Sequence, residues 1–348
     1  MESRNCLFPP PAFYTNLMHS FHVVSYPVYL FTLITLLRNS SNSLHTYKYY
    51  ILGHIVMNMI SESFVSFAML PIAYLSYAML RTTGWMARFG FSGLFQFYIL
   101  TFLVSLTVGS ILEMLYFRFK VCIVQYKEHT SFKVLRFQVN IFRFLTFFPI
   151  VYESIGFPWS IEGQQRKILE IYEQTPSLPA EFTCYSCVIA LLTDWVTMLS
   201  IACWTVQLIV ALSSFGICLF SVWKFMQSSL NHFSKETMKL QKMLLLSLFI
   251  QVTIHATLIG IPVFFMIFAM FYDLKNDDFG LILLLLLAYH GFVSTCAMIF
   301  FTKPLRDEFL PCLKKKTRVK PRARSISQSH GEQYCPVLTS HCYFSGNM

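Results

Sequence analysis

The sequence predicts an all-α membrane protein, a bundle of seven transmembrane helices with its N-terminus outside the cell and its C-terminus in the cytoplasm. Composition, seven apolar runs and the distribution of basic residues lead to this prediction. Of the 348 residues, 55% are hydrophobic and only 13% are charged, whereas about a quarter of a soluble domain is charged. The mean hydropathy of +0.54 likewise indicates a chain that is mostly apolar. A bilayer is therefore the expected solvent.

Seven segments are apolar on all faces for about 20 residues or more, the length that crosses a bilayer as a helix. Backbone polar groups in hydrocarbon must be satisfied within the segment, and the runs do not alternate as barrel strands do, so we expect helices. The expected spans are residues 19–37, 49–80, 91–117, 139–155, 188–223, 243–272 and 280–302. The prediction is weakest for the fourth span, because Arg143 and Pro149 interrupt its apolar run.

Basic residues set the orientation and the domain boundaries. The segments on one side of the spans, including the tail, contain 20 Lys and Arg, and those on the other side contain six. The positive-inside rule places the richer side in the cytoplasm. We therefore expect an extracellular N-terminus at residues 1–18, a transmembrane domain at 19–302 and a basic cytoplasmic tail at 303–348. No cleaved signal peptide is evident, so the first span is expected to act as a signal anchor.

The net charge of +10 raises the question of a nucleic-acid partner. Residues 303–324 contain nine Lys and Arg but only two acidic residues, so most of the excess lies beside the last span. That position predicts attraction to the anionic lipids of the cytoplasmic leaflet. Zinc-ligand spacing and a Gly-rich phosphate loop are both missing from the sequence. Membrane lipids, and no nucleic acid, are the expected partners.

Ionisable side chains within a span are costly and point to function. Glu62, His255 and His290 lie at similar depths near the middle of the bilayer, and Gln251 precedes His255 by one turn. These four residues could form a polar network between helices, contact a ligand or bind a metal. The network is preferred, because Gln251 and His255 share a helix face. We assign no metal and no cofactor.

A second polar group is expected at the outer ends of the spans. It combines polar and aromatic side chains, namely Gln96, Glu153, Asp194, Trp85, Phe95, Phe97 and Tyr98. Such a mixture is typical of an outward pocket for a small organic molecule. It is equally typical of an aromatic belt at the membrane interface.

Short motifs along the chain form a recognisable pattern. The seventh span contains His290, Gly291, Ser294 and Thr295, and it is followed by Pro304 and Arg306. In order and placement these residues resemble the ending of the nematode serpentine chemoreceptors, most closely class H, with class I as a near relative. The resemblance covers residues 6–306. It departs from the family at Leu305, where Tyr is usual, and at the end of the third span, where Glu113 and Arg118 are five residues apart.

The resemblance implies a G-protein-coupled receptor of chemosensory neurons. Its implied partners are a heterotrimeric G protein and an unknown small-molecule ligand. The implied location is the plasma membrane, as a multi-pass protein, with the ciliary membrane of such neurons as a specific site. A seven-span ligand-gated channel or transporter is the alternative, although internal repeats, charged rings and carbonyl filters are not found in the sequence. The sequence contains no catalytic motif, and we do not expect the chain to be an enzyme.

The expected contacts with the G protein lie at the cytoplasmic ends of the third and sixth spans. A ligand outside affects a partner inside only if two bundle states present different cytoplasmic surfaces. Candidates are Arg118 together with Lys235, Lys239 and Lys242, which fall at i, i+4 and i+7 on one helix face. A solvated basic face with only a topological role is the alternative.

Three cysteines are expected on the oxidising side of the membrane, where disulfides form. We expect Cys6 to pair with Cys184 or with Cys187, and the sequence does not choose between them. Residues 84–109 contain no cysteine, so the bridge that many seven-span receptors make from the top of the third helix is unavailable.

Overall fold

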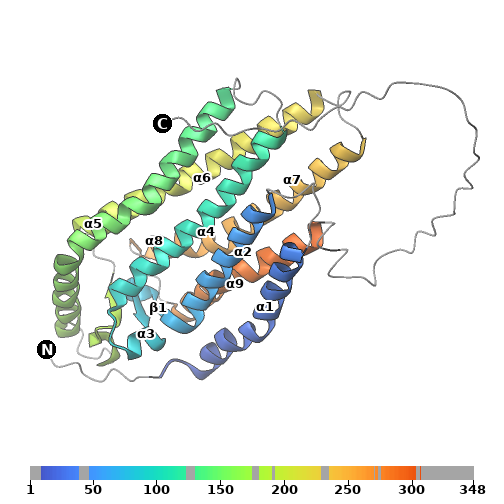
Figure 1. Ribbon diagram of the computed structural model, residues 1–348. Helices are drawn as coiled ribbons and strands as arrows, with labels where there is room; N and C mark the ends of the chain where they lie inside the picture. Colours follow the sequence, from blue (N-terminus) through green and yellow to red (C-terminus); the bar gives the residue numbers. More distant parts are fainter. Residues whose placement is uncertain are drawn as a thin grey trace, which may run out of the picture. The chain divides into compact units, whose positions relative to one another are not determined.

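Seven long helices form a bundle (Figure 1). The computed structural model describes residues 9–38, 47–122, 130–174, 180–189, 193–228, 235–269, 271–272, 276–302 and 306. Within these residues, seven helices are long and apolar enough to cross a bilayer. The predicted seven-helix fold class is confirmed.

The long helices are joined by short elements at one end of the bundle. The spans are α1 (Ala12–Arg38), α2 (Tyr47–Ser63) with π-helix η2 (Phe64–Met69), α4 (Gly93–Cys122), α5 (Thr130–Gln174), α6 (Trp195–Ser228), α7 (Lys235–His255) with π-helix η6 (Ala256–Gly260) and α8 (Ile261–Ala269), and α9 (Asp277–Phe301). The short helices are α3 (Trp85–Arg88), η3 (Leu75–Tyr77) and η5 (Ala180–Thr183). A small sheet marks this end, here called the sheet end; the other is called the opposite end.

The last third of the predicted second span 49–80, residues 70–80, is wrong. The helix ends at Met69, because Leu70 adopts a left-handed conformation with φ of 40° and Pro71 has no N–H to donate. The chain then forms a hairpin of β1 (Pro71–Tyr74) and β2 (Met79–Thr82). The strands satisfy each other's backbone groups, so an apolar run is accommodated without a helix.

A third strand explains why the fifth span begins later than predicted. β3 (Cys187–Ile189) pairs antiparallel with β2, in the order β1-β2-β3, and α6 begins only at Trp195. The same segment contacts the start of α4, where the Gly93 N–H donates to the carbonyl of Tyr185 at 3.1 Å. A Cβ at Gly93 would lie 2.4 Å from the Ser186 carbonyl oxygen, so this approach requires glycine.

The fourth span is much longer than its predicted residues 139–155. α5 has 45 residues, which at about 1.5 Å per residue gives ~67 Å, roughly twice the bilayer core. Its last part carries exposed ion pairs, from Arg166 to Glu162 and from Lys167 to Glu170, both at 3.0 Å. Figure 1 shows that α5 changes direction towards the sheet end, and Pro158 lies within this helix.

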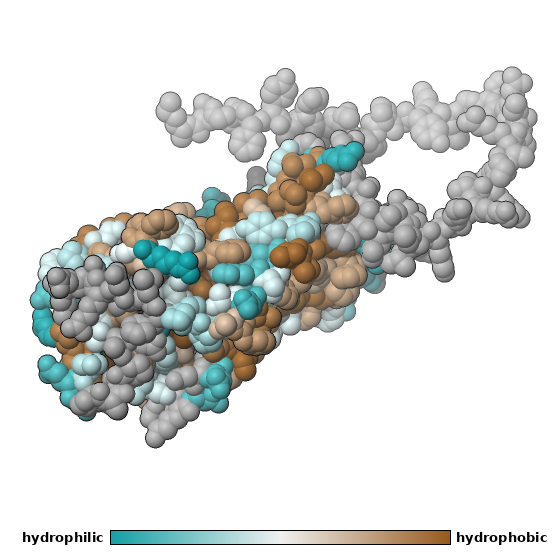
Figure 2. Space-filling model, turned by 90° about the horizontal axis from the view of Figure 1, so that it is seen from below, coloured by the Kyte–Doolittle hydropathy of each residue, from teal (hydrophilic) through white to brown (hydrophobic). Residues whose placement is uncertain are grey.

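The bundle is packed inside and apolar outside. One core cluster contains Leu115 and Leu248, and a second contains Met69 and Leu284, nearer the sheet. Large apolar side chains are also exposed on the helices, including Phe137 at 65%. Figure 2 shows broad hydrophobic areas on the flank of the described bundle. Exposed apolar surface of this extent is what a lipid-facing bundle requires.

Candidate functional site

A cavity of about 270 Å³ lies in the sheet-end half of the bundle. Side chains of α4, α6, η6, α8 and α9 line it. Met79 and Leu80 of β2 and Val188 and Ile189 of β3 also line it, so the sheet forms one wall. The volume is close to the lower limit for small-molecule sites.

The cavity is mostly apolar, with a few placed polar groups. Gln207 of α6 accepts a hydrogen bond at its Oε1 from the Ser105 hydroxyl of α4, at 3.0 Å. Gln164 of α5 accepts one at its Oε1 from the Ile189 N–H, at 3.3 Å, which ties the long helix to the sheet. Apolar walls with few convergent polar groups suit the binding of a small organic molecule.

The structure divides the predicted aromatic residues between two places. Phe97 and Tyr98 line the cavity, and the Phe97 ring packs edge-on against Trp204 with centroids 5.6 Å apart. Trp85 and Phe95 are exposed on the surface. Two of the four aromatic residues thus line the cavity, and the other two lie on the surface, where an interfacial belt would be.

The polar members of the predicted outer pocket are not among the described residues that line the cavity. Gln96 is fully buried, and its Nε2 donates to a backbone carbonyl at 3.0 Å. Glu153 accepts a hydrogen bond from the Ser200 hydroxyl at 3.1 Å. Asp194 accepts one from the Thr197 N–H at 3.2 Å and caps the start of α6.

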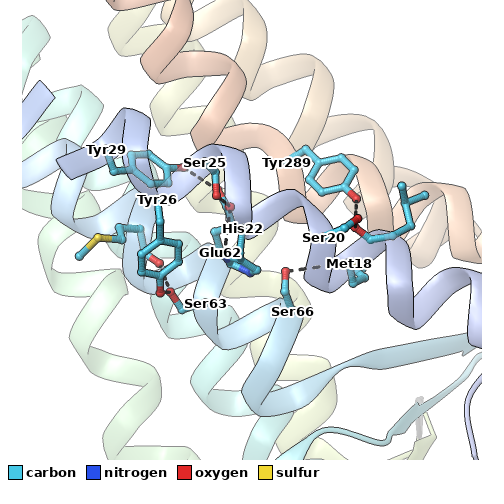
Figure 3. A network of polar contacts seen from close by, with 12 residues as sticks. Met18, Ser20, His22, Ser25, Tyr26, Tyr29, Glu62, Ser63, Ser66 and Tyr289 are labelled. Atoms are coloured by element: carbon cyan, nitrogen blue, oxygen red, sulfur yellow. Dashed lines mark hydrogen bonds and ion pairs between the residues drawn. The ribbon is translucent and has the colours of Figure 1, made fainter. Parts of the chain in front are cut away.

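Glu62 is buried between α1 and α2 (Figure 3). Its carboxylate accepts hydrogen bonds from the Ser25 hydroxyl at 2.5 Å and from the Tyr29 hydroxyl at 2.6 Å. The His22 ring lies 3.5 Å away through Nδ1. Three side chains of α1 therefore converge on one carboxylate of α2, and none of these three was predicted to lie in the network.

A separate group of three histidines joins α2, α7 and α9. The rings of His255 and His290 have centroids 5.4 Å apart, and His54 lies 5.2 Å from His255. The Asn58 amide donates to His54 at 3.1 Å, and His255 Nδ1 donates to the backbone carbonyl of Gln251 at 2.8 Å. His54 and Asn58 were missed, although residues 54, 58 and 62 recur at i, i+4 and i+8 on α2.

Glu62 and the histidines form two networks. The hydrogen bonds of Glu62 run to α1, whereas His54 contacts the hydroxyls of Ser110 at 2.7 Å and Ser294 at 3.5 Å, on α4 and α9. Among the described residues, no group of three or more His, Cys, Asp or Glu side chains could hold a metal ion. The geometry supports polar links between helices.

The motif glycine of α9 lies where three helices meet. A Cβ at Gly291 would lie 2.7 Å from the Tyr29 hydroxyl and 2.8 Å from the Asn58 Cβ. Both distances are too short for any side chain. Gly291 therefore permits the close approach of α9 to α1 and α2, beside both polar networks.

The other motif residues have local roles where they are described. The Thr295 hydroxyl donates to the Gly291 carbonyl at 2.9 Å, within α9. The Arg306 N–H donates to the Thr302 carbonyl at 2.9 Å and continues the chain after α9. Pro304 lies outside the described residues.

At the opposite end, Arg118 of α4 is buried although it is a cation. Its guanidinium carbon lies 3.4 Å from the centroid of the Tyr47 ring, a cation–π contact. Its Nε and Nη2 have no hydrogen-bond partner among the described residues. The ring of Tyr47 thus holds a cation whose donors are only partly used.

The three candidate lysines belong to one helix, because α7 begins at Lys235. The side chain of Lys242 is exposed. Those of Lys235 and Lys239 lie outside the described residues.

Glu113, five residues before Arg118, pairs with a different helix. Its Oε1 lies 2.6 Å from Nη2 of Arg143 on α5 and accepts a hydrogen bond from Nε at 2.7 Å. This pair explains how the fourth span accommodates Arg143, since a charge in a span requires a partner.

The outer cysteines lie beside the sheet where they are described. Cys184 is disulfide-bonded, and Cys187 of β3 is buried and carries a thiol. Cys6 lies outside the described residues. The pairing with Cys6 stays a prediction.

Comparison with known proteins places the chain in a family. The family model described as serpentine type 7TM GPCR chemoreceptor Srh matches residues 9–315, most of the chain. None of the curated proteins and none of the solved structures compared with the chain matches it. The seven long apolar helices of the described bundle agree with that family, which is one of receptors and not of enzymes. This chain is therefore a member of the Srh family of serpentine seven-transmembrane chemoreceptors.

Proposed function

We propose that this chemoreceptor binds a small organic molecule in the cavity and activates a heterotrimeric G protein at the opposite end of the bundle. The observation that carries the proposal is the cavity wall formed by Ile259 and Gly260 of η6 and Pro262 of α8. A π-helical turn followed by proline interrupts the sixth span at this wall. A ligand that contacts this break can bias α7, whose N-terminal half carries Lys242.

Such coupling requires two bundle states to which the ligand binds with different affinity. The break in the sixth span is a suitable element, because helices change direction most easily at π-turns and prolines. The histidine cluster adjoins it, since η6 follows His255 directly. Movement of α7 would change the packing of His255 on His54 and His290.

The orientation that this function needs has the sheet end outside and the tail in the cytoplasm of a plasma-membrane receptor. A tag at Met1 is expected to react with an impermeant reagent on intact cells, and a tag at Met348 only after permeabilisation. The expectation rests on the 20 against 6 division of Lys and Arg. Labelling of Met348 but not of Met1 on intact cells would contradict both the predicted orientation and the proposed receptor function.

Release of Arg118 from its aromatic ring is expected to favour signalling. Tyr47→Leu should raise ligand-independent G-protein activation several-fold, because a desolvated cation–π contact contributes about 2 kcal/mol. Tyr47→Phe retains the ring and should leave basal activation unchanged. Activation is measured as nucleotide exchange by purified G protein, normalised to surface receptor.

The matched test removes the charge itself. Arg118→Gln should strongly reduce activation, whereas Lys120→Gln removes a charge from the same end of α4 and should have little effect. Equal losses in the two variants would leave Arg118 with only a topological role.

The whole proposal is tested by screening small organic molecules on cells that express the chain, with G-protein activation and membrane current recorded together. A ligand that activates the G protein without a current supports the receptor. A current in vesicles that contain only this protein would establish the channel alternative instead.

A further inference from the structure

The described residues that line the cavity include no Asp, Glu, Lys, Arg or His. Their polar side-chain groups are hydroxyls, the indole N–H of Trp204 and the amides of Gln164 and Gln207. A charged molecule in such a site would lose its hydration and gain no counter-ion, which is strongly unfavourable. The lining therefore selects for uncharged molecules.

One buried donor in this lining has no acceptor within the part of the chain that the structure describes. Gln207 is 6% exposed, and its Oε1 accepts the hydrogen bond from Ser105 that fixes the amide. Its Nε2 has no hydrogen-bond partner among the described residues. A buried donor left unpaired is unfavourable, so an acceptor delivered by a ligand gains more here than on an open surface.

The other residues that line the cavity are mainly apolar and aromatic. Trp204, one turn earlier on α6, lines the cavity with Phe97, and Leu287 of α9 lines it as well. The volume of about 270 Å³ corresponds to on the order of ten non-hydrogen atoms, at the ~30 Å³ that each water occupies in the liquid. A short hydrocarbon body fits this space.

We propose that the ligands of this cavity are uncharged, mainly hydrocarbon molecules with a single strong hydrogen-bond acceptor, such as ketones or esters, and that Gln207 Nε2 donates to that acceptor. The proposal rests on the proposed function in taking the cavity as the ligand site. Ser105 acts as a positioning residue, because it orients the Gln207 amide.

The test uses four probes of nearly equal size: 2-octanone, nonane, octylammonium and octanoate. Binding is measured as the rise in the melting temperature of the full-length receptor in lipid nanodiscs over a concentration series. Wild-type receptor is expected to bind 2-octanone about tenfold more tightly than nonane, as for one neutral hydrogen bond. The two ions should give no saturable shift.

Gln207→Leu should lower the affinity for 2-octanone about tenfold and leave the affinity for nonane unchanged or higher. This loss of preference cannot arise from misfolding, because nonane binding is retained. Gln138→Leu is the matched control: Gln138 bonds to Ser213 and Ser214 and does not line the described cavity, so the preference for the ketone should remain. Ala211→Phe fills the cavity and should abolish binding of both neutral probes.

Equal binding of 2-octanone to wild type and Gln207→Leu would overturn the proposal, as would tighter binding of either ion or no binding of any neutral probe. G-protein activation is recorded separately. If binding depends on Gln207 but no G-protein activation follows, the proposed ligand class is supported and the proposed receptor function is contradicted. Activation that survives Ala211→Phe would instead place the ligand site outside this cavity.

Discussion

Replacing Gly291 by leucine is expected to abolish folded receptor at the cell surface. A Cβ at this position would already lie within 2.8 Å of both Tyr29 and Asn58, and leucine adds three further carbon atoms to the same contact. Overpacking typically costs about 1–3 kcal/mol and sometimes more. The change would also displace Tyr29 and Asn58 from Glu62 and His54, so two polar networks would be lost together.

The smaller change gives a measurable intermediate. Gly291→Ala is expected to lower the free energy of unfolding by about 1–3 kcal/mol, read as a lower melting temperature of purified receptor. The control is Gly53→Ala, in the middle of α2, because nothing lies within 4 Å of a Cβ there. Alanine at residue 53 should be neutral or stabilise by up to ~1 kcal/mol through helix propensity. Equal effects at the two glycines would contradict the packing role of Gly291.

The sequence predicts the bundle because a bilayer leaves few options: a long apolar run must be a helix. The same argument fails at residues 71–80, which continue the apolar run of the second span but lie in a hairpin. Strands that pair with each other at the end of a bundle satisfy their backbone as well as a helix does. A left-handed Leu70 decides the outcome, and hydropathy does not report backbone conformation.

Depth within a span can be predicted from residue number, whereas the direction that a side chain faces towards other helices cannot. Glu62, His255 and His290 were therefore placed at one level and expected to meet, but Glu62 faces α1 while His255 and His290 face His54. The spacing of residues 54, 58 and 62 on α2 was a usable indication of a polar face. Gln207 was detectable only as an isolated amide in an apolar run, because its unpaired donor is a property of the packed structure.

Removing Glu62 is expected to detach α1 from the rest of the bundle. Glu62→Leu removes the acceptor for the hydroxyls of Ser25 and Tyr29. Each buried donor left unsatisfied costs about 1–3 kcal/mol, which is a large part of a total stability of roughly 5–15 kcal/mol. Because both donors lie on α1, hydrogen exchange should increase mainly in α1, with α6 much less affected.

A matched pair of tyrosines separates this network from general damage to the interface. Tyr29→Phe and Tyr26→Phe each delete one hydroxyl on α1 that bonds to α2: Tyr29 to buried Glu62, and exposed Tyr26 to Ser63, both at 2.6 Å. Tyr29→Phe should reproduce part of the increase in α1 exchange, and Tyr26→Phe should change it little, because the Ser63 hydroxyl still donates to the Met59 carbonyl. Glu62→Gln should lie between wild type and Glu62→Leu, since its amide oxygen still accepts a hydrogen bond. If the two tyrosine variants exchanged alike, or if Glu62→Leu loosened all helices equally, Glu62 would not be the anchor of α1.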